Sequence, residues 1–151
     1  MTDTFSRQRN RQLAILIVED DRDLAGLWQQ YLQNQNHTVD VCSSVEDAEI
    51  LIHSNPYDVA IIDIFLREGE RVHSEGGITL INRVRLKEVT ATIRQRLMVL
   101  AITGAPERSF GQFNALDSVA DLSDSVMHKP VPLDALGREV NRLHGANRSL
   151  Q

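Results

Sequence analysis

The sequence lacks the features that support covalent cross-linking, membrane insertion or broad nucleic-acid binding. Its 151 residues include one cysteine, Cys42, so no disulfide can form within the chain, and we expect a reducing, cytoplasmic location. No apolar run approaches the roughly 18 residues that span a bilayer. The polar stretch Met1–Gln12 lacks the apolar core of a secretory signal. Acidic residues outnumber basic ones by 21 to 16, and the net charge of −5 argues against a basic nucleic-acid-binding face.

The remaining composition is typical of one soluble globular domain. Hydrophobic residues make up 42% of the chain and charged residues 25%, which is enough apolar material for a sizeable core. The sequence contains no internal repeat, low-complexity segment or interdomain linker. We therefore divide the chain into a flexible N-terminal extension (1–11), one domain (12–145) and a short C-terminal tail (146–151).

Strand-like and helix-like patterns alternate along the chain. Apolar or alternating segments predict five strands: Leu13–Val18, Thr38–Cys42, Val59–Asp63, Leu97–Ile102 and Ser125–His128. Apolar residues at helical spacing follow each of these strands and predict five helices. These are a helix capped by an acidic residue and closed by Asn34–His37, one capped by Ser43 or Ser44, one at Gly77–Lys87, an ambiguous one within Ala105–Asp124, and one at Leu133–Leu143. Strict alternation of this kind predicts an α/β fold with a parallel sheet wound on both faces.

The segment Val59–Asp63 is the centre of this arrangement. Its apolar, branched residues predict a strand that is buried on both faces, as in the middle of a parallel sheet. The segment ends abruptly in the carboxylate of Asp63. In open α/β sheets, ligands collect at the carboxyl ends of the strands. Asp63 is therefore the first candidate for a functional residue.

Polar residues also end three of the other four strands of the predicted sheet. They are Glu19, Asp20 and Asp21 after the first strand, Thr103 after the fourth and Lys129 after the fifth. Because the carboxyl ends of parallel strands meet at one edge, we expect these side chains to converge on Asp63. Clustered carboxylates repel one another, and Mg²⁺, which prefers oxygen ligands, relieves that repulsion.

This set of groups suits phosphoryl chemistry. Asp63 can act as a nucleophile toward phosphorus and form an aspartyl phosphate, with the metal offsetting charge on the transferred group. Lys129 can pair with a phosphoryl oxygen, and the hydroxyl of Thr103 can donate to another.

The set Glu19-Asp20, Asp63, Thr103 and Lys129-Pro130 resembles the receiver domain of two-component response regulators. The resemblance covers about Gln12 to Leu143 and rests on four separated motifs in the family's order. It implies a flavodoxin-like (βα)5 fold with the strand order 2-1-3-4-5. The order of the motifs, rather than any one of them, makes the signal specific.

The resemblance also implies a role for each matching residue. Asp63 would accept a phosphoryl group from a histidine kinase or a histidine phosphotransfer protein. Asp20 would bind Mg²⁺ directly and Glu19 through water, with the backbone carbonyl of Phe65 as a further ligand. Thr103 would follow the phosphoryl group and Lys129 would pair with it, while Asp21 would cap the first helix or support the metal site.

Four departures from the family pattern concern the transmission of the signal. Arg67 occupies the position four residues after Asp63, where receivers usually have proline, and the loop to Gly76 or Gly77 is longer than usual. Val126 stands where an aromatic residue usually reports the activated state. The segment between Thr103 and Lys129 is also longer. We expect the phosphorylation site to be intact and the usual switch between threonine and the aromatic residue to be altered.

From this resemblance we expect a stand-alone receiver that signals through a downstream protein partner or a phosphorelay, without contacting nucleic acid or a membrane. Homodimerisation is left open. The alternative is an unphosphorylated interaction scaffold of the same fold. A phosphatase with an aspartate nucleophile would carry a second acid two residues later, where this chain has Phe65, so we do not expect a turnover enzyme.

Three further groups of residues carry simpler expectations. The charged loop Arg67–Glu75 is expected to be solvated and mobile, with a partner contact as its alternative. Cys42 is expected to be a small buried residue. The histidines show no metal-ligand spacing; they are His37, His53, His73, His128 and His144.

Overall fold

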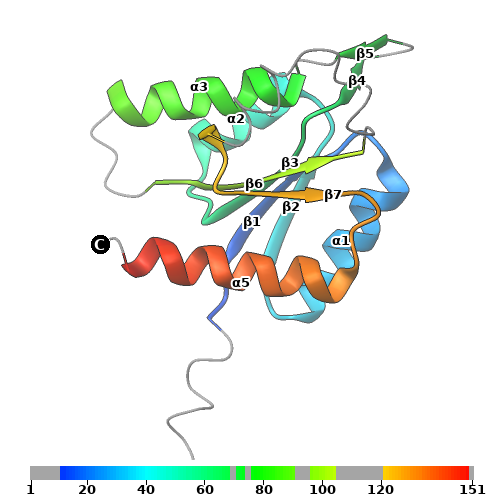
Figure 1. The fold of residues 1–151 in the computed structure, drawn as a ribbon, viewed down its shortest axis with the longest axis vertical. Coiled ribbons are helices and arrows are strands. Elements are labelled where there is room, and N and C mark those ends of the chain that lie inside the picture. The colour runs from blue at the N-terminus through cyan, green and yellow to red at the C-terminus, as the bar shows by residue number, and fades with distance from the viewer. Residues whose placement is uncertain (1–10, 69–70, 74–75, 91–95, 105–120, 150–151) are drawn as a thin grey trace, which may run out of the picture.

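A five-stranded parallel sheet forms the centre of the protein in a computed structural model, which describes residues 11–68, 71–73, 76–90, 96–104 and 121–149 (Figure 1). The strands are β1 (Ala14–Val18), β2 (Thr38–Cys42), β3 (Val59–Asp63), β6 (Met98–Thr103) and β7 (Ser125–His128). Their order in the sheet is β2-β1-β3-β6-β7, and every neighbouring pair is parallel. This order confirms the predicted 2-1-3-4-5 arrangement.

Helices cover both faces of the sheet. The helices are α1 (Arg22–Asn34), α2 (Val45–Ser54), α3 (Gly76–Thr90) and α5 (Leu133–Ser149). Figure 1 shows α1 and α5 on one face and α2 and α3 on the other. The ambiguous helix predicted within Ala105–Asp124 falls mainly on 105–120, outside the described residues. Among the described helices, none combines the length and the apolar character needed to cross a membrane.

The core has two layers because successive strand residues point to opposite faces of the sheet. In β3, Val59 and Ile61 pack with α1 and α5, whereas Ala60 and Ile62 pack with α2 and α3. All four of these side chains are fully buried, as the apolar run in the sequence predicts. Asp63 completes the strand and is itself buried.

The helix starts follow the capping residues that the sequence predicts. The Asp21 side chain accepts hydrogen bonds from the backbone N–H groups of Asp23 and Leu24, which lack partners within α1. Ser44 accepts one from the backbone N–H of Asp47 at the start of α2. These caps fix the points at which the chain leaves the sheet edge.

The connection after Asp63 is more ordered than we expected. It contains β4 (Leu66–Glu68) and β5 (Arg71–His73), which form an antiparallel hairpin that projects from the sheet edge (Figure 1). The expectation of a loop throughout this connection is wrong for the backbone of these two strands, while the expected solvation and mobility stay predictions. The hairpin sequence has few apolar residues and therefore gave little indication of strands. Helix α3 is also longer than predicted, beginning one residue earlier and ending at Thr90.

Candidate functional site

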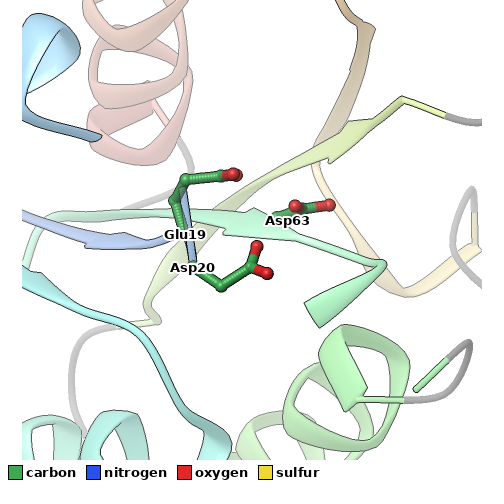
Figure 2. Close-up of side chains that lie close together, drawn as sticks. All are labelled: Glu19, Asp20 and Asp63. Carbon is green, nitrogen blue, oxygen red and sulfur yellow. The ribbon is translucent and has the colours of Figure 1, made fainter. Parts of the chain in front are cut away.

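Three carboxylates meet at the carboxyl edge of the sheet. Glu19 and Asp20 directly follow β1, and Asp63 is the last residue of the neighbouring β3. One oxygen from each of the three lies within 4.8 Å of the others, and Figure 2 shows the side chains converging on a common space. The parallel pairing of β1 with β3 therefore creates the acidic cluster that the sequence predicts.

Burial makes this cluster electrostatically costly. The Glu19 side chain is almost fully buried, as is that of Asp63, while Asp20 is half-buried. Loss of hydration, together with the charge of Asp63 and a hydrogen bond to it, raises the pKa of Glu19 from 4.5 to about 8. Glu19 therefore favours either a proton or a nearby cation at neutral pH.

Lys129 supplies one cation. Its Nζ lies 3.1 Å from Oε1 of Glu19 and 3.2 Å from Oδ2 of Asp63. Burial alone would lower the pKa of Lys129, but the charges and hydrogen bonds of the two carboxylates outweigh burial and raise it. The ammonium group thus stays protonated beside Asp63. There it can pair with an anion carried by that carboxylate.

Backbone contacts hold Lys129 in this position. Its amide donates to the carbonyl of Thr103 at 2.8 Å, which continues the pairing of β7 with β6. Gly104 leaves room for the aliphatic part of the lysine, because a Cβ there would lie 3.1 Å from Cδ of Lys129. The sequence predicted Lys129 and Thr103, but gave no role to Gly104.

Thr103 ends β6 at the same edge and is 1% exposed. Its Oγ1 is buried and has no hydrogen-bond partner among the described residues. A buried hydroxyl without a hydrogen-bond partner is costly, so this group favours a ligand that accepts a hydrogen bond from it. The structure thus places a free donor at the end of the strand beside β3.

The chain just after Asp63 is fixed from two sides. The amide of Phe65 donates to Oδ1 of Asp63 at 2.9 Å and orients the carboxylate. Gly77, near the start of α3, packs directly on the backbone of Asp63 and Ile64, where a Cβ would lie 2.3 Å from the Asp63 carbonyl oxygen. The family resemblance implied a metal-ligand role for the Phe65 carbonyl, which stays a prediction, and gave no role to the Phe65 amide.

Asp21 does not belong to the three-carboxylate cluster. Its side chain caps α1, and its backbone N–H donates to Oε1 of Glu19 at 3.3 Å. The capping role is therefore confirmed. The structure otherwise brings Glu19, Asp20, Asp63 and Lys129 into one cluster, as the positions of the strand ends predict.

The donor set fits a hard divalent cation such as Mg²⁺. Three carboxylates offer oxygen ligands close together, which is the ligand type this ion prefers. Oε2 of Glu19 is buried and has no hydrogen-bond partner among the described residues. A cation beside it would offset both the missing contact and the repulsion within the cluster.

Known proteins with similar sequences include a transcriptional regulatory protein and a regulatory protein. The chain is 25% identical to the virulence transcriptional regulatory protein PhoP of Salmonella typhimurium over 138 residues, which are 91% of this chain and 54% of that protein. It is 34% identical to the regulatory protein VanR of Enterococcus faecium over 73 residues, 48% of this chain and 29% of that protein. The matched region thus spans about half or less of these relatives.

Solved receiver structures share the fold. A receiver domain protein (CheY-like) of Methanospirillum hungatei JF-1 superposes with a TM-score of 0.75 at 17% identity, covering 93% of this chain and 100% of that one. The receiver domain of the Francisella response regulator 1452 gives a TM-score of 0.69 at 21% identity, covering 89% and 98%. At these identities the likeness concerns the fold.

The sequence profile of the response regulator receiver domain matches residues 15–141, which span every described strand of the central sheet except the first residue of β1. This match includes all the residues of the acidic cluster, together with Thr103 and Lys129. The chain therefore belongs to the response regulator receiver domain family, which serves phosphorylation-based two-component signalling.

Proposed function

We propose that Asp63 of this receiver accepts a phosphoryl group from the phosphohistidine of a histidine kinase or a histidine phosphotransfer protein. The observation that carries the proposal is the placement of Asp63. Its carboxylate lies 3.2 Å from Nζ of Lys129 and within 4.8 Å of ligand oxygens from Glu19 and Asp20. A nucleophile, a cation and a metal-ligand set thus occupy one small space.

In the proposed step, an Asp63 carboxylate oxygen forms a bond to phosphorus while the bond from phosphorus to the donor imidazole nitrogen breaks. The electron pair of that bond stays on the imidazole, and the product is an aspartyl phosphate. Phe65 holds one Asp63 oxygen through its amide, which helps to orient the other. Mg²⁺, held by Asp20, Asp63 and Glu19, would offset the charge on the transferred group.

The chain's own residues also account for a response to phosphorylation. The phosphoryl group adds roughly −1.5 to −2 charge. Lys129 can exchange its contacts with Glu19 and Asp63 for phosphoryl oxygens, and the unpaired hydroxyl of Thr103 can donate to another. These changes would shift the carboxyl ends of β6 and β7 toward a second conformation. In that conformation the protein would bind a downstream protein partner or pass the phosphoryl group on.

Signal transmission past this edge would not use an aromatic side chain on β7. The half-buried Val126 packs against the core on the α2 and α3 side, where the family usually has an aromatic residue.

We further propose that the protein works in the cytoplasm and undergoes self-phosphorylation and dephosphorylation without turning over an external substrate.

The test is phosphorylation by acetyl phosphate with and without Mg²⁺, followed by intact-protein mass spectrometry. We expect wild type to gain one phosphoryl group only with Mg²⁺, and Asp63→Asn to gain none. Asp23 is an exposed aspartate in the first turn of α1 and three residues after Asp20, so Asp23→Asn is a matched control and should behave like wild type. Absence of any gain in wild type would contradict the proposal and favour an interaction scaffold.

A further inference from the structure

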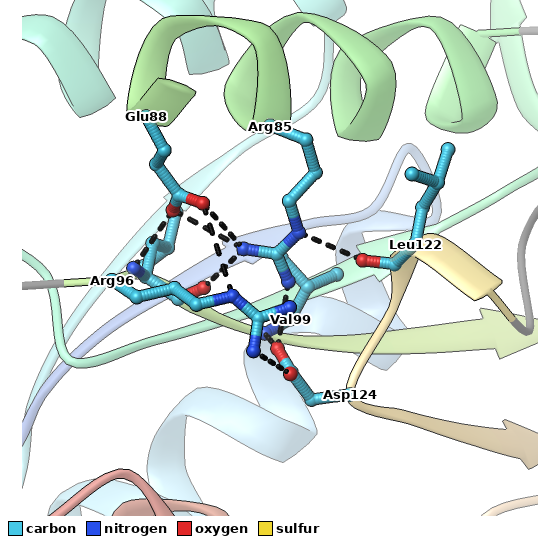
Figure 3. Close-up of polar contacts among 7 residues, drawn as sticks. Arg85, Glu88, Arg96, Val99, Leu122 and Asp124 are labelled. Atoms are coloured by element: carbon cyan, nitrogen blue, oxygen red, sulfur yellow. Dashed lines mark hydrogen bonds and ion pairs between the residues drawn. The ribbon is translucent and has the colours of Figure 1, made fainter. Parts of the chain in front are cut away.

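A cluster of charged residues ties α3 to the edge of the sheet opposite the phosphorylation site. It comprises Arg85 and Glu88 of α3, Arg96 just before β6, and Asp124 just before β7; we call it the Arg85 cluster (Figure 3). The side chains of Arg85 and Asp124 are only 11% and 9% exposed. Removing one partner of an ion pair that is this deeply buried leaves the other charge uncompensated and lowers stability.

The guanidinium of Arg85 donates hydrogen bonds to four different residues. Nε donates to the Leu122 carbonyl at 2.8 Å, and Nη2 donates to Oδ2 of Asp124 at 2.7 Å. Nη1 donates to the Leu97 carbonyl at 2.8 Å and to Oε2 of Glu88 at 2.9 Å. Figure 3 shows the guanidinium lying between Glu88, Leu122 and Asp124. One side chain of α3 therefore holds the chain just before both β6 and β7.

Asp124 fixes the start of β7 against β6. Its backbone N–H donates to the Val99 carbonyl at 2.8 Å, and its Oδ2 accepts from the Val99 N–H at the same distance. The other oxygen, Oδ1, accepts from Nη1 of Arg96 at 2.6 Å. Both oxygens and the amide of Asp124 are thus used, and together with Arg85 they hold this residue in one place.

β7 is short and stands at the edge of the sheet. Its four residues separate Asp124 from Lys129, and within the described sheet it pairs only with β6. Because only these four residues lie between them, a displacement of Asp124 along the strand would shift the backbone of Lys129 against Thr103, its hydrogen-bond partner on β6. The Nζ of Lys129 has to reach Asp63 at 3.2 Å, so a small displacement at the far end matters at the site.

Helix α3 completes the connection. Gly77 at its start packs on the backbone of Asp63, and Arg85 lies two turns further along the helix. Figure 1 shows α3 running back along the sheet from the edge with the hairpin toward the end where β6 begins. The helix thus contacts the phosphoacceptor strand at one end and the start of the lysine-bearing strand at the other.

We propose that Arg85 and Asp124 are positioning residues for Lys129: by fixing where β7 begins, they set the distance between the lysine ammonium and the Asp63 carboxylate. This inference rests on the proposed function, because it assigns the cluster a role in phosphoryl transfer to Asp63. It distinguishes the Arg85 cluster from an ion-pair network that contributes stability alone.

The test compares phosphorylation rates with acetyl phosphate and saturating Mg²⁺, measured by intact mass at a temperature where circular dichroism shows each variant folded. Arg85→Lys keeps the charge but cannot reach all four partners, and we expect it to slow phosphorylation about tenfold, less than the ~100-fold that a full 1 Å misplacement can cost. Arg83→Lys is the matched control: Arg83 lies on the same helix and pairs with Glu49 on the surface, so its rate should stay at the wild-type value.

A double-mutant cycle separates positioning from stability. If Arg85 acts through Lys129, adding Arg85→Lys to Lys129→Met should slow phosphorylation no further than Lys129→Met alone. Asp124→Asn, which keeps the side-chain shape, should repeat this pattern, and it carries the test if Arg85→Lys does not fold. Equal rates for Arg85→Lys and wild type, or slowing that multiplies with that of Lys129→Met, would overturn the inference. Failure of wild type to gain any phosphoryl group would instead overturn the proposed function, and this inference with it.

Discussion

Replacing Gly77 by alanine tests how β3, the strand that ends in Asp63, is held. A Cβ at this position would lie 2.3 Å from the Asp63 carbonyl oxygen and 2.4 Å from Cα of Ile64. Both atoms belong to the backbone, so no side-chain rotation can relieve the overlap. The start of α3 would have to move away from β3 by about 1 Å to restore ordinary packing.

The two energetic effects of this substitution oppose each other. Overpacking of a tight contact costs about 3 kcal/mol at the upper end of the usual range. Alanine favours a helix over glycine by about 1 kcal/mol. We therefore expect Gly77→Ala to lower the free energy of unfolding by about 2 kcal/mol. Because the displaced backbone is that of Asp63, phosphorylation by acetyl phosphate should also slow.

The assay is urea unfolding followed by circular dichroism and by the fluorescence of Trp28, the single and fully buried tryptophan. Gly26→Ala in α1 is the control, because Gly26 is exposed and a Cβ there would have no atom within 4 Å. We expect that substitution to raise stability by up to about 1 kcal/mol. A Gly77→Ala protein as stable as wild type, or more stable, would refute the close contact.

Three further predictions concern individual side chains. Lys129→Met removes the cation beside the three carboxylates, so Mg²⁺ should bind several-fold more tightly in a calorimetric titration; unchanged or weaker binding would contradict the site electrostatics. Burial and the charge of His144 lower the pKa of His37, whose Nδ1 accepts from the Leu13 amide. The contribution of neutral His37 to the free energy of unfolding is therefore complete above about pH 6.5, the pKa of histidine in the unfolded chain. It is lost as the pH falls through the lower pKa of His37 in the folded protein. His37→Asn should flatten the fall in unfolding free energy on acidification, whereas His53→Gln on the surface should not. Burial raises the pKa of Cys42 to about 12, so a thiol reagent should react with it only after unfolding, and rapid reaction of the native protein would count against its burial.

The parallel sheet and the main cluster could be predicted because they depend on local patterns, whereas the strand order was implied by the family resemblance. The apolar run ending at Asp63 marks a central strand, and polar residues placed directly after strands must meet where parallel strands end together. The caps at Asp21 and Ser44 were predictable for the same reason, since each satisfies backbone groups within three residues.

Features that depend on distant contacts could not be predicted in this way. Nothing near Gly77 in the sequence signals that it meets the Asp63 backbone. Arg85 and Asp124 lie 39 positions apart and read as ordinary surface charges until the fold brings them together. The hairpin of β4 and β5 was missed because only two of its six strand residues, Leu66 and Val72, are apolar. Leu27 fits the helical spacing but is 51% exposed, because spacing alone does not fix the width of the buried face.

The most direct test of the central claim is to identify the residue that carries the phosphoryl group. The protein would be phosphorylated with acetyl phosphate and Mg²⁺, and then treated with borohydride, which reduces an aspartyl phosphate to homoserine. Tandem mass spectrometry of the resulting peptides locates the reduced residue. We predict homoserine at position 63 alone. Its appearance at Asp20, or at no aspartate in a protein that has gained the phosphoryl mass, would contradict the assignment of Asp63 as the phosphoacceptor.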